Sequence, residues 1–312
     1  MGMKKYVIYT ILTGGYDDIL QPLVIDVRFD YVLFSNDFKE ENIGVWQVRP
    51  IPIPPEIKPN DNQRLSRYPK MHPETLLAEY EASLYHDANI QITDQWVYER
   101  FVELIDKNVD YAGMQLSVLA TEYNKTPRDD VYEHAYDMCM RGVIHDTEAI
   151  IECNTLYKNG FPEHFGLNEN GIIFRRHNER MQQVDEMWWW WIVNYTKRDQ
   201  LCYMYCLWEN NIPLVYFLPP GENLYNTSHL CIQHHDNKEV VKSRKFIKDY
   251  RFFEKIRLKT RGMNQSTYDY FLRQWVWIIK RRNPLFWNCL LGIIFGFIYA
   301  PRKISRMIKI RI

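Results

Sequence analysis

The chain places four cationic or potentially cationic side chains within nine residues: Arg64, Arg67, Lys70 and His72. Arginine and lysine donate charge-assisted hydrogen bonds to phosphate oxygens. The residue types and their spacing, around a proline at position 69, therefore predict a phosphate site in this stretch.

A second feature, Asp87-Ala-Asn89, follows a short apolar run at residues 83–85. In an extended segment, residues i and i+2 point to the same side, so Asp87 and Asn89 would present two oxygens to one hard cation. A divalent ion held there would bridge a diphosphate and neutralise its charge as a leaving group. The alternative is an ordinary turn, because Asp and Asn are common turn residues. The basic cluster just upstream favours the cation site.

Strands and helices must position these side chains. Apolar runs bounded by turn residues predict strands at 6–12, 31–35, 46–53, 83–85, 111–119, 172–175, 213–217 and 230–233. Helical spacing is found from Pro73 through Leu76, Leu77, Tyr80 and Leu84, and again over 95–108, 128–159 and 201–207. Four consecutive tryptophans at 188–191 would point all round a helix, so some pack inward and at least one meets solvent or a ligand.

Composition limits the class of protein. With 312 residues the chain can form one large α/β domain and an appendage, and its 46% apolar and 15% aromatic content describes an ordered globular protein. Its 6 cysteines have no C-x-x-C spacing. They are therefore expected to be reduced residues of a cytosolic protein, with no disulfide framework or zinc site.

The net charge of zero hides a division along the chain. Residues 238–312 hold 19 Lys and Arg against 4 Asp and Glu, whereas residues 1–237 hold 20 against 35. Residues 283–301 carry no charge, and cations flank them on both sides. We expect a catalytic domain at 1–237 and a basic, aromatic, helical region at 238–312 that lies on a membrane. A buried C-terminal helix is the alternative.

Four motifs occur in order along residues 5–236. They are Tyr-Thr-Ile-Leu-Thr-Gly-Gly-Tyr-Asp at 9–17, Arg-x-x-Arg-x-x-Lys-x-His-Pro at 64–73, Tyr-His-Asp-Ala-Asn-Ile at 85–90 and Thr-Lys-Arg-Asp-Gln-Leu at 196–201. These motifs resemble a family of plant and bacterial glycosyltransferases related to mucilage hexosyltransferases. The resemblance implies a GT-A-like α/β fold, a Rossmann-like mixed sheet that binds a nucleotide sugar between flanking helices. Asn89 stands where related metal-dependent transferases usually carry Asp.

The resemblance also implies site residues. In such a sheet ligands bind beyond the carboxyl ends of the strands. The expected nucleotide-sugar site is Tyr9, Thr10, Thr13, Gly14, Tyr16, Asp17, Arg64, Arg67, Lys70 and His72. Asp199 and Gln200 are similar to a pair that glycogenin-like and lipooligosaccharide galactosyltransferases place near the anomeric carbon, so we expect them to bind and orient the donor sugar. For Asp199 the alternative is a helix N-terminal charge paired with Arg198. Asp185 and Glu186 are the other candidates for a catalytic base.

His234 and His235 follow the last expected strand. By resemblance, one of them completes a metal shell with Asp87 and Asn89, and an imidazole beside carboxylate oxygen suits Mn²⁺, with Mg²⁺ as the other candidate ion. The alternative is a pair of exposed loop histidines.

The sequence thus predicts a cytoplasmic hexosyltransferase, peripheral to the inner face of the membrane and acting in polysaccharide biosynthesis. Its expected partners are a nucleotide-sugar donor, with UDP-sugar favoured, a glycan or lipid-linked glycan acceptor, and the membrane surface; nucleic acid is not expected. Two other classes stay open. A metal-dependent hydrolase of a lipid or phosphodiester would use the same ion and tail. A nucleic-acid-binding protein would explain the basic tail but not the acidic body.

Overall fold

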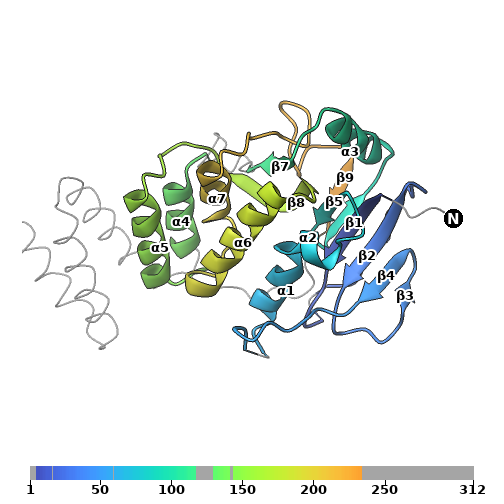
Figure 1. The fold of residues 1–312 in the computed structure, drawn as a ribbon, viewed down its shortest axis with the longest axis horizontal. Helices are drawn as coiled ribbons and strands as arrows, with labels where there is room; N and C mark the ends of the chain where they lie inside the picture. Colours follow the sequence, from blue (N-terminus) through green and yellow to red (C-terminus); the bar gives the residue numbers. More distant parts are fainter. Residues whose placement is uncertain (1–4, 16, 59, 117–128, 141–142, 234–312) are drawn as a thin grey trace, which may run out of the picture. The chain divides into compact units, whose positions relative to one another are not determined.

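The computed structural model describes residues 5–15, 17–58, 60–116, 129–140 and 143–233. Seven strands form a mixed sheet in the order β3-β4-β2-β1-β5-β8-β7 (Figure 1). Their bounds are β1 Tyr6–Ile11, β2 Phe29–Phe34, β3 Asn42–Ile43, β4 Trp46–Arg49, β5 Ala82–His86, β7 Tyr111–Gln115 and β8 Asn168–Arg176. β1 runs parallel to β2 and β5, and β2 runs parallel to β4. β3, β7 and β8 pair antiparallel with their neighbours. The predicted α/β class with a mixed sheet is confirmed.

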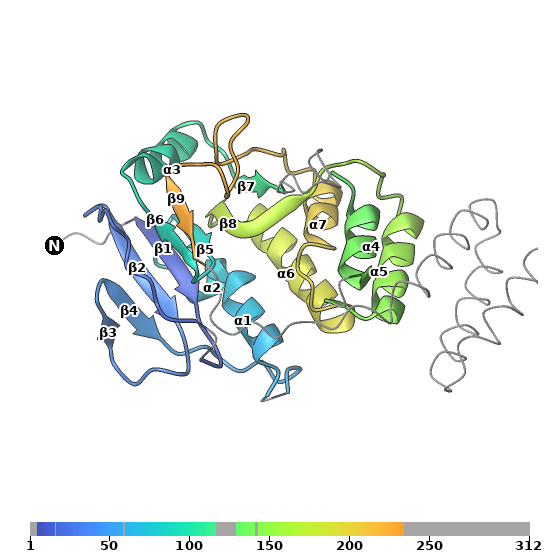
Figure 2. The ribbon, with the colours of Figure 1, turned by 180° about the vertical axis from the view of Figure 1, so that it is seen from behind.

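Helices and a small second sheet cover the two faces of the large one. The helices are α1 Asn62–Lys70, α2 Pro73–Leu76, α3 Trp96–Asp106, α4 Val131–Met140, α5 Asp146–Lys158, α6 Glu179–Asn194 and α7 Tyr203–Glu209. The second sheet pairs β6 Ile90–Ile92 with β9 Leu230–Ile232. Side chains alternate along a strand, so Val7 and Tyr9 of β1 pack among α1, α6 and α7, whereas Ile8 packs with α3, β6 and β9. Figures 1 and 2 both show α3 beside β9.

Several expected elements differ from the structure, and the helical stretch expected over 128–159 is divided into α4 and α5. The basic stretch at 62–70 is helix α1, which Asp61 caps by accepting the N–H of Arg64. The helix from Pro73 ends at Leu76, because Glu81 already joins the sheet through the Lys5 carbonyl, and Leu84 belongs to β5. The expected strand at 213–217 is reduced to one bridge between Gly113 and Tyr216.

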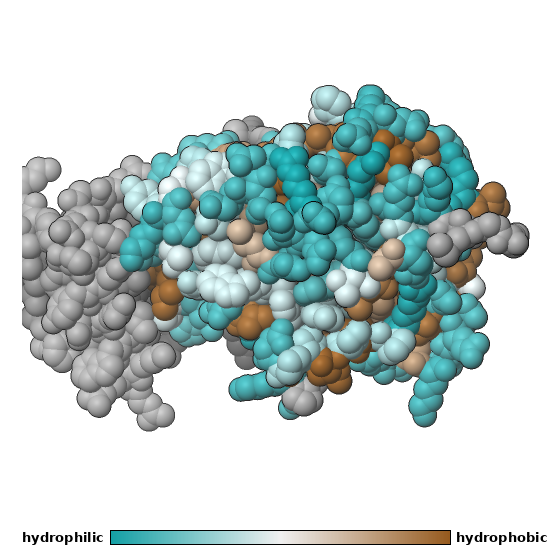
Figure 3. All heavy atoms as spheres, viewed as in Figure 1, coloured by the Kyte–Doolittle hydropathy of each residue, from teal (hydrophilic) through white to brown (hydrophobic). Residues whose placement is uncertain are grey.

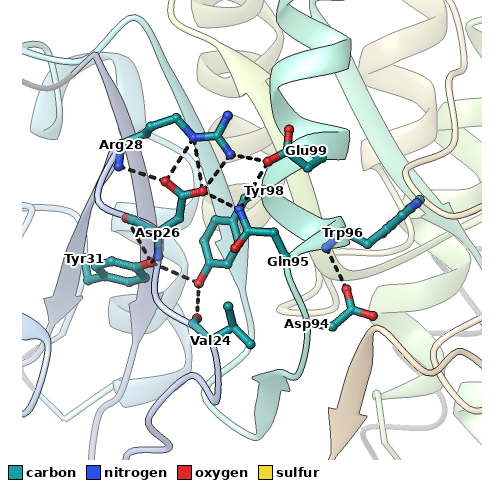
Figure 4. Close-up of polar contacts among 9 residues, drawn as sticks. All are labelled: Val24, Asp26, Arg28, Tyr31, Asp94, Gln95, Trp96, Tyr98 and Glu99. Atoms are coloured by element: carbon teal, nitrogen blue, oxygen red, sulfur yellow. Dashed lines mark hydrogen bonds and ion pairs between the residues drawn. The ribbon is translucent and has the colours of Figure 1, made fainter.

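A polar cluster fixes the segment before β2 to α3 (Figure 4). The Arg28 guanidinium and the Gln95 amide both bond the Asp26 carboxylate, and Arg28 also bonds Glu99 on α3. The hydrogen bond from Arg28 is the main cause that lowers the pKa of Asp26 to about 2. The hydroxyl of Tyr98 bonds the Val24 carbonyl. This cluster attaches the end of the loop between β1 and β2 to α3.

The surface of the face shown in Figure 3 is mainly hydrophilic, and its hydrophobic residues form small separate groups. Within the described part of the chain, no helix combines the length and the apolar character needed to cross a bilayer. The expected domain boundary between residues 237 and 238, and the whole region 238–312, lie outside the described residues.

Candidate functional site

The candidate site lies at the edge of the large sheet where the parallel strands have their carboxyl ends. The segments that follow β1 and β2 meet there, because the Gly15 N–H donates to the Asp37 carboxylate over 3.0 Å. Strand β8 is antiparallel to β5 and starts at the same edge, so the Asp87 N–H bonds the Gly171 carbonyl at 2.9 Å. Open α/β sheets bind ligands at such an edge.

A buried ion pair joins α1 to the loop that follows α6. Lys70 Nζ lies 2.7 Å from Asp199 Oδ2, and the side chains are 2% and 5% exposed. Arg67 Nε lies 3.5 Å from the same oxygen. The Lys70 ammonium also lies 4.6 Å from the centre of the Tyr85 ring. The structure thus brings together three predicted site residues, two on a helix and one 129 positions further along the chain.

The charges around Asp199 keep it ionised. Burial alone would raise the pKa of Asp199, but Arg67, Lys70 and Arg198 outweigh burial and hold that pKa below its usual range. Burial lowers the pKa of Lys70, and Asp199 opposes this shift. Asp199 is therefore a fixed negative charge and a poor proton acceptor near neutral pH.

Asp185 lies in a different environment, under the sheet. Its Oδ2 accepts from Arg175 Nη1 at 2.6 Å, and both side chains are buried. Burial raises the pKa of Asp185 well above its usual range, against the opposing effect of Arg175. Arg175 Nη2 also donates to the Lys70 carbonyl at 2.6 Å and bonds the Tyr9 hydroxyl. The Arg175 and Asp185 ion pair thus holds the backbone of Lys70 in place through the hydrogen bond to its carbonyl.

The four residues of the basic cluster do not converge. Arg64 donates to the carbonyls of Ile192 and Tyr195 at 2.9 and 3.2 Å, so it caps the C-terminal end of α6. His72 bonds the Tyr68 carbonyl at 2.9 Å, and burial lowers its pKa, which disfavours its cationic form. Arg67 and Lys70, in contrast, lie one turn apart on α1 and both reach Asp199, whereas Arg64 lies one turn earlier beside the end of α6 and His72 follows the end of the helix.

The glycine loop after β1 approaches α1 closely. Gly14 has φ +73°, and a Cβ at that position would lie 2.7 Å from the Asn62 side-chain nitrogen. Thr13 donates to the Asn62 carbonyl at 3.3 Å. Gly14 is thus required for this packing.

The other described residues predicted to bind the nucleotide sugar near this loop are less exposed to solvent than Gly14. Tyr9 and Thr10 are completely buried, and Asp17 is half-buried. Tyr16 lies outside the described residues.

The Asp87 to Asn89 segment is a turn between β5 and β6, so the expected extended conformation is wrong. Three residues must reverse the chain here, since the Ile90 N–H bonds the Asp87 carbonyl at 2.9 Å. The Asp87 side chain is 43% exposed, lies 3.8 Å from Lys70 Nζ and accepts the Tyr85 hydroxyl at 2.6 Å. The amide nitrogen of Asn89, in contrast, donates to the Gln233 carbonyl at 2.9 Å.

These contacts bear on the expected metal site. Among the described residues no group of three acidic, histidine or cysteine side chains has the geometry for a metal ion. The Asp87 carboxylate is partly open to solvent at the site edge. The Gln233 N–H bonds the Asn89 carbonyl at 2.8 Å, so the chain reaches this turn just before His234. His234 and His235 themselves lie outside the described residues.

Glu169, near the start of β8, belongs to this edge although the sequence did not single it out as a site residue. Gln200 donates to Glu169 Oε1 and to the Asn168 carbonyl, each at 3.3 Å. Burial raises the pKa of Glu169 to about 7, with Arg198 opposing the shift and Asp87 and Asp199 adding to it. A lone Glu at the start of a strand carries no sequence signal of this kind, because the shift depends on residues far away in the chain.

The four tryptophans divide as expected. Three of them are buried: Trp188, Trp189 and Trp191; Trp190 is 51% exposed. Trp188 stacks on Tyr203 at 3.7 Å between ring centres and donates to the Asp199 carbonyl at 3.0 Å. Helix α6 therefore holds Asp199 by its backbone. Glu186, the second alternative base, bonds Gln182 on its own helix at 2.8 Å.

The fold and the site define an α/β protein with a charged, partly buried site at the carboxyl edge of a mixed sheet. No protein-family model matches the chain, and no curated protein matches it. One similar solved structure is the X-ray structure of the mannosyltransferase Ktr4p from S. cerevisiae, with a TM-score of 0.36 and 10% sequence identity. The similarity covers 65% of this chain and 65% of that one. A likeness of this size assigns neither activity nor residue roles to this chain.

Proposed function

We propose that the chain is a glycosyltransferase that moves a sugar from a nucleotide-sugar donor, a UDP-sugar first among the candidates, to a glycan or lipid-linked glycan. One observation carries the proposal. The buried pair of Lys70 and Asp199, with Arg67 beside it and Asp87 open to solvent, lies at the edge of the mixed sheet where its parallel strands have their carboxyl ends. A diphosphate needs such cations, and a sugar needs fixed polar groups to orient its hydroxyls.

The proposed reaction is a displacement at the anomeric carbon. An acceptor hydroxyl oxygen forms a bond to that carbon, the bond to the diphosphate oxygen breaks, and its electron pair leaves with the nucleoside diphosphate. Arg67 and Lys70 stabilise the charge on the leaving group, which is the main catalytic effect. Asp199 and Gln200 orient the sugar. Glu169 accepts the hydroxyl proton, since its pKa near 7 suits that task, Asp199 is held ionised in an ion pair and Asp185 is buried under the sheet.

A divalent cation is part of the proposal. Asp87 and Asn89, with His234 or His235, would hold Mn²⁺ or Mg²⁺, which supplies further neutralisation of the diphosphate charge. The support is the exposed carboxylate of Asp87 and the pairing of Gln233 with the same turn. The Asn89 amide nitrogen already serves that pairing, so we expect Asp87 to be the main ligand in the turn.

The place of action is proposed from the charge division. An acidic body with a strongly basic, aromatic tail suits a protein at the inner face of a membrane, where anionic headgroups attract lysine and arginine. A lipid-linked acceptor in polysaccharide biosynthesis would lie at the same surface.

Binding of the donor tests the proposal without requiring the acceptor. Isothermal titration with a panel of nucleotide sugars, with and without Mn²⁺, is expected to find one donor that binds, and to find weaker binding in Arg67→Gln. The matched control is Arg49→Gln, a residue on β4 whose partner is Glu79. Absence of binding by every nucleotide sugar would contradict the proposal.

A further inference from the structure

Arg198 is a cation at the candidate site whose guanidinium Nε has no hydrogen-bond acceptor among the described residues. It directly precedes Asp199 in the loop between α6 and α7, and its backbone N–H bonds the Thr196 hydroxyl at 3.3 Å. Its Nε is shielded from solvent and has no hydrogen-bond acceptor within the described part of the chain. Arg67 Nε is in the same condition, with only the longer ion pair to Asp199. A shielded N–H without an acceptor costs free energy until a ligand supplies one.

The guanidinium of Arg198 interacts electrostatically with the other site charges. Its charge lowers the pKa of Asp199, after the larger effects of Arg67 and Lys70, and it opposes the burial that raises the pKa of Glu169. Lys70 already occupies Asp199 Oδ2 at 2.7 Å. Glu169, with its pKa near 7, is only partly ionised at neutral pH. The positive charges of this group are thus incompletely balanced by its carboxylates.

Arg64 cannot fill this role, although the sequence places it first in the basic cluster. Its guanidinium already bonds the Asp61 carboxylate at 3.0 Å and two carbonyls at the end of α6. Those carbonyls belong to Ile192 and Tyr195, just before the loop that carries Arg198. Arg64 is therefore a positioning residue for the loop.

We infer that Arg198, together with Arg67 and Lys70, binds the diphosphate of the donor. The inference rests on the proposed function. It assigns to Arg198 the phosphate contact that the basic motif at 64–73 would assign to Arg64. A guanidinium offers a planar fork of N–H groups that matches two phosphate oxygens, which an ammonium cannot do. The chemical class of ligand is therefore a nucleoside diphosphate, bound through its two linked phosphoryl groups.

Titration calorimetry on the full-length chain tests this inference, with nucleoside diphosphates and inorganic pyrophosphate as probes. For the diphosphate that the wild type binds, Arg198→Gln is expected to raise the Kd by about tenfold or more, which is the usual effect of losing a charged hydrogen bond. The salt dependence of binding should also become less steep, because one screened charge is lost. Arg180→Gln is the matched control, since Arg180 is 45% exposed and paired with Asp110; its Kd should equal that of the wild type.

The outcomes separate the inference from the proposed function. An unchanged Kd in Arg198→Gln, with an unchanged melting temperature, overturns the inference and leaves the proposed function intact. Binding of no nucleoside diphosphate by the wild type overturns both. Where Arg198→Gln melts more than a few degrees lower, Arg198→Lys decides: weaker binding supports the fork contact, and wild-type affinity overturns it. Binding of geranyl diphosphate in preference to every nucleoside diphosphate would assign the cations to a lipid-linked acceptor and overturn the donor assignment.

Discussion

Asp199 and Glu169 show how one site gives two carboxylates different chemistry. Asp199 is surrounded by cations and its pKa is lowered, whereas burial raises the pKa of Glu169 to about 7. The first is suited to fix charges and orient a substrate, and the second to exchange a proton near neutral pH.

Removing the charge of Asp199 should destabilise the fold. Asp199→Asn leaves the Lys70 ammonium buried without its partner, so we expect a loss of about 3–5 kcal/mol in the free energy of unfolding. Urea denaturation measures this loss. Asp106→Asn, on the exposed end of α3, is the control and should change the free energy of unfolding by less than about 0.5 kcal/mol. Equal stability of the two variants would show that the ion pair is not buried as described.

Glu169 should control the pH dependence of turnover. In the wild type kcat/KM is expected to rise with pH through about 7, as the Glu169 carboxyl loses its proton and becomes able to accept one. Glu169→Gln should abolish this rise and lower kcat by about 10²- to 10⁴-fold. The exposed Glu41→Gln variant serves as the control. If Glu169→Gln kept the same rise, the proton would have another acceptor.

At the scale of elements, α5 supports the loop that carries Arg198 and Asp199. Glu152 on α5 is buried, and its Oε2 accepts the Thr196 N–H at 3.1 Å. Burial raises the pKa of Glu152 to about 8. The loop is therefore attached to a carboxyl group that is mainly protonated at neutral pH.

This attachment predicts a pH effect on stability. A carboxyl group whose pKa is raised on folding binds its proton more tightly in the folded state, so its contribution is complete below the ordinary pKa of about 4.3 and is lost as the pH rises through about 8. Glu152→Gln keeps an acceptor for the Thr196 N–H but cannot ionise. Its melting temperature should fall less than that of the wild type between pH 5 and 9. Parallel curves for the two proteins would contradict the assignment.

The same elements show what the sequence could and could not predict. β1, β2 and β5 were predictable because their apolar runs are short and are followed by Gly, Asn or Asp, and β1 is also rich in β-branched residues. Helix α1 was not predicted, because its polar residues and Pro69 read as a break, whereas the structure has Pro69 in the last turn of the helix, one residue before its end.

The candidate site was predictable only in part. The charged residue types at Lys70, Asp87 and Asp199 indicate a charged site from the sequence alone. The direction of Arg64 depends on the end of α6, 128 residues away, and the pKa of Glu169 depends on burial. Neither property is encoded in local spacing.

At the scale of the whole molecule, the opposite charges of the two sequence regions predict membrane binding. The full-length chain should sediment with vesicles that contain anionic phosphatidylglycerol, and less of it should do so at higher salt, because salt screens the attraction to basic side chains. The triple variant Lys280→Gln, Arg281→Gln and Arg282→Gln should bind more weakly, since each cation near the surface contributes about 1 kcal/mol. Lys39→Gln in the body is the control. Equal vesicle binding of the triple variant and the wild type would contradict a role of these cations in membrane binding.

The most direct test of the central claim is transfer itself. Full-length protein is incubated with Mn²⁺, labelled nucleotide sugars and a membrane fraction that supplies acceptors, and release of nucleoside diphosphate is measured together with label in the glycan. The account predicts release from one donor, matched by sugar incorporation, reduced at least about tenfold in Asp87→Ala and unchanged in the control Asp106→Ala. Release from every donor at a similar rate, or equal release by Asp87→Ala and the wild type, would contradict a glycosyl transfer at this edge of the sheet.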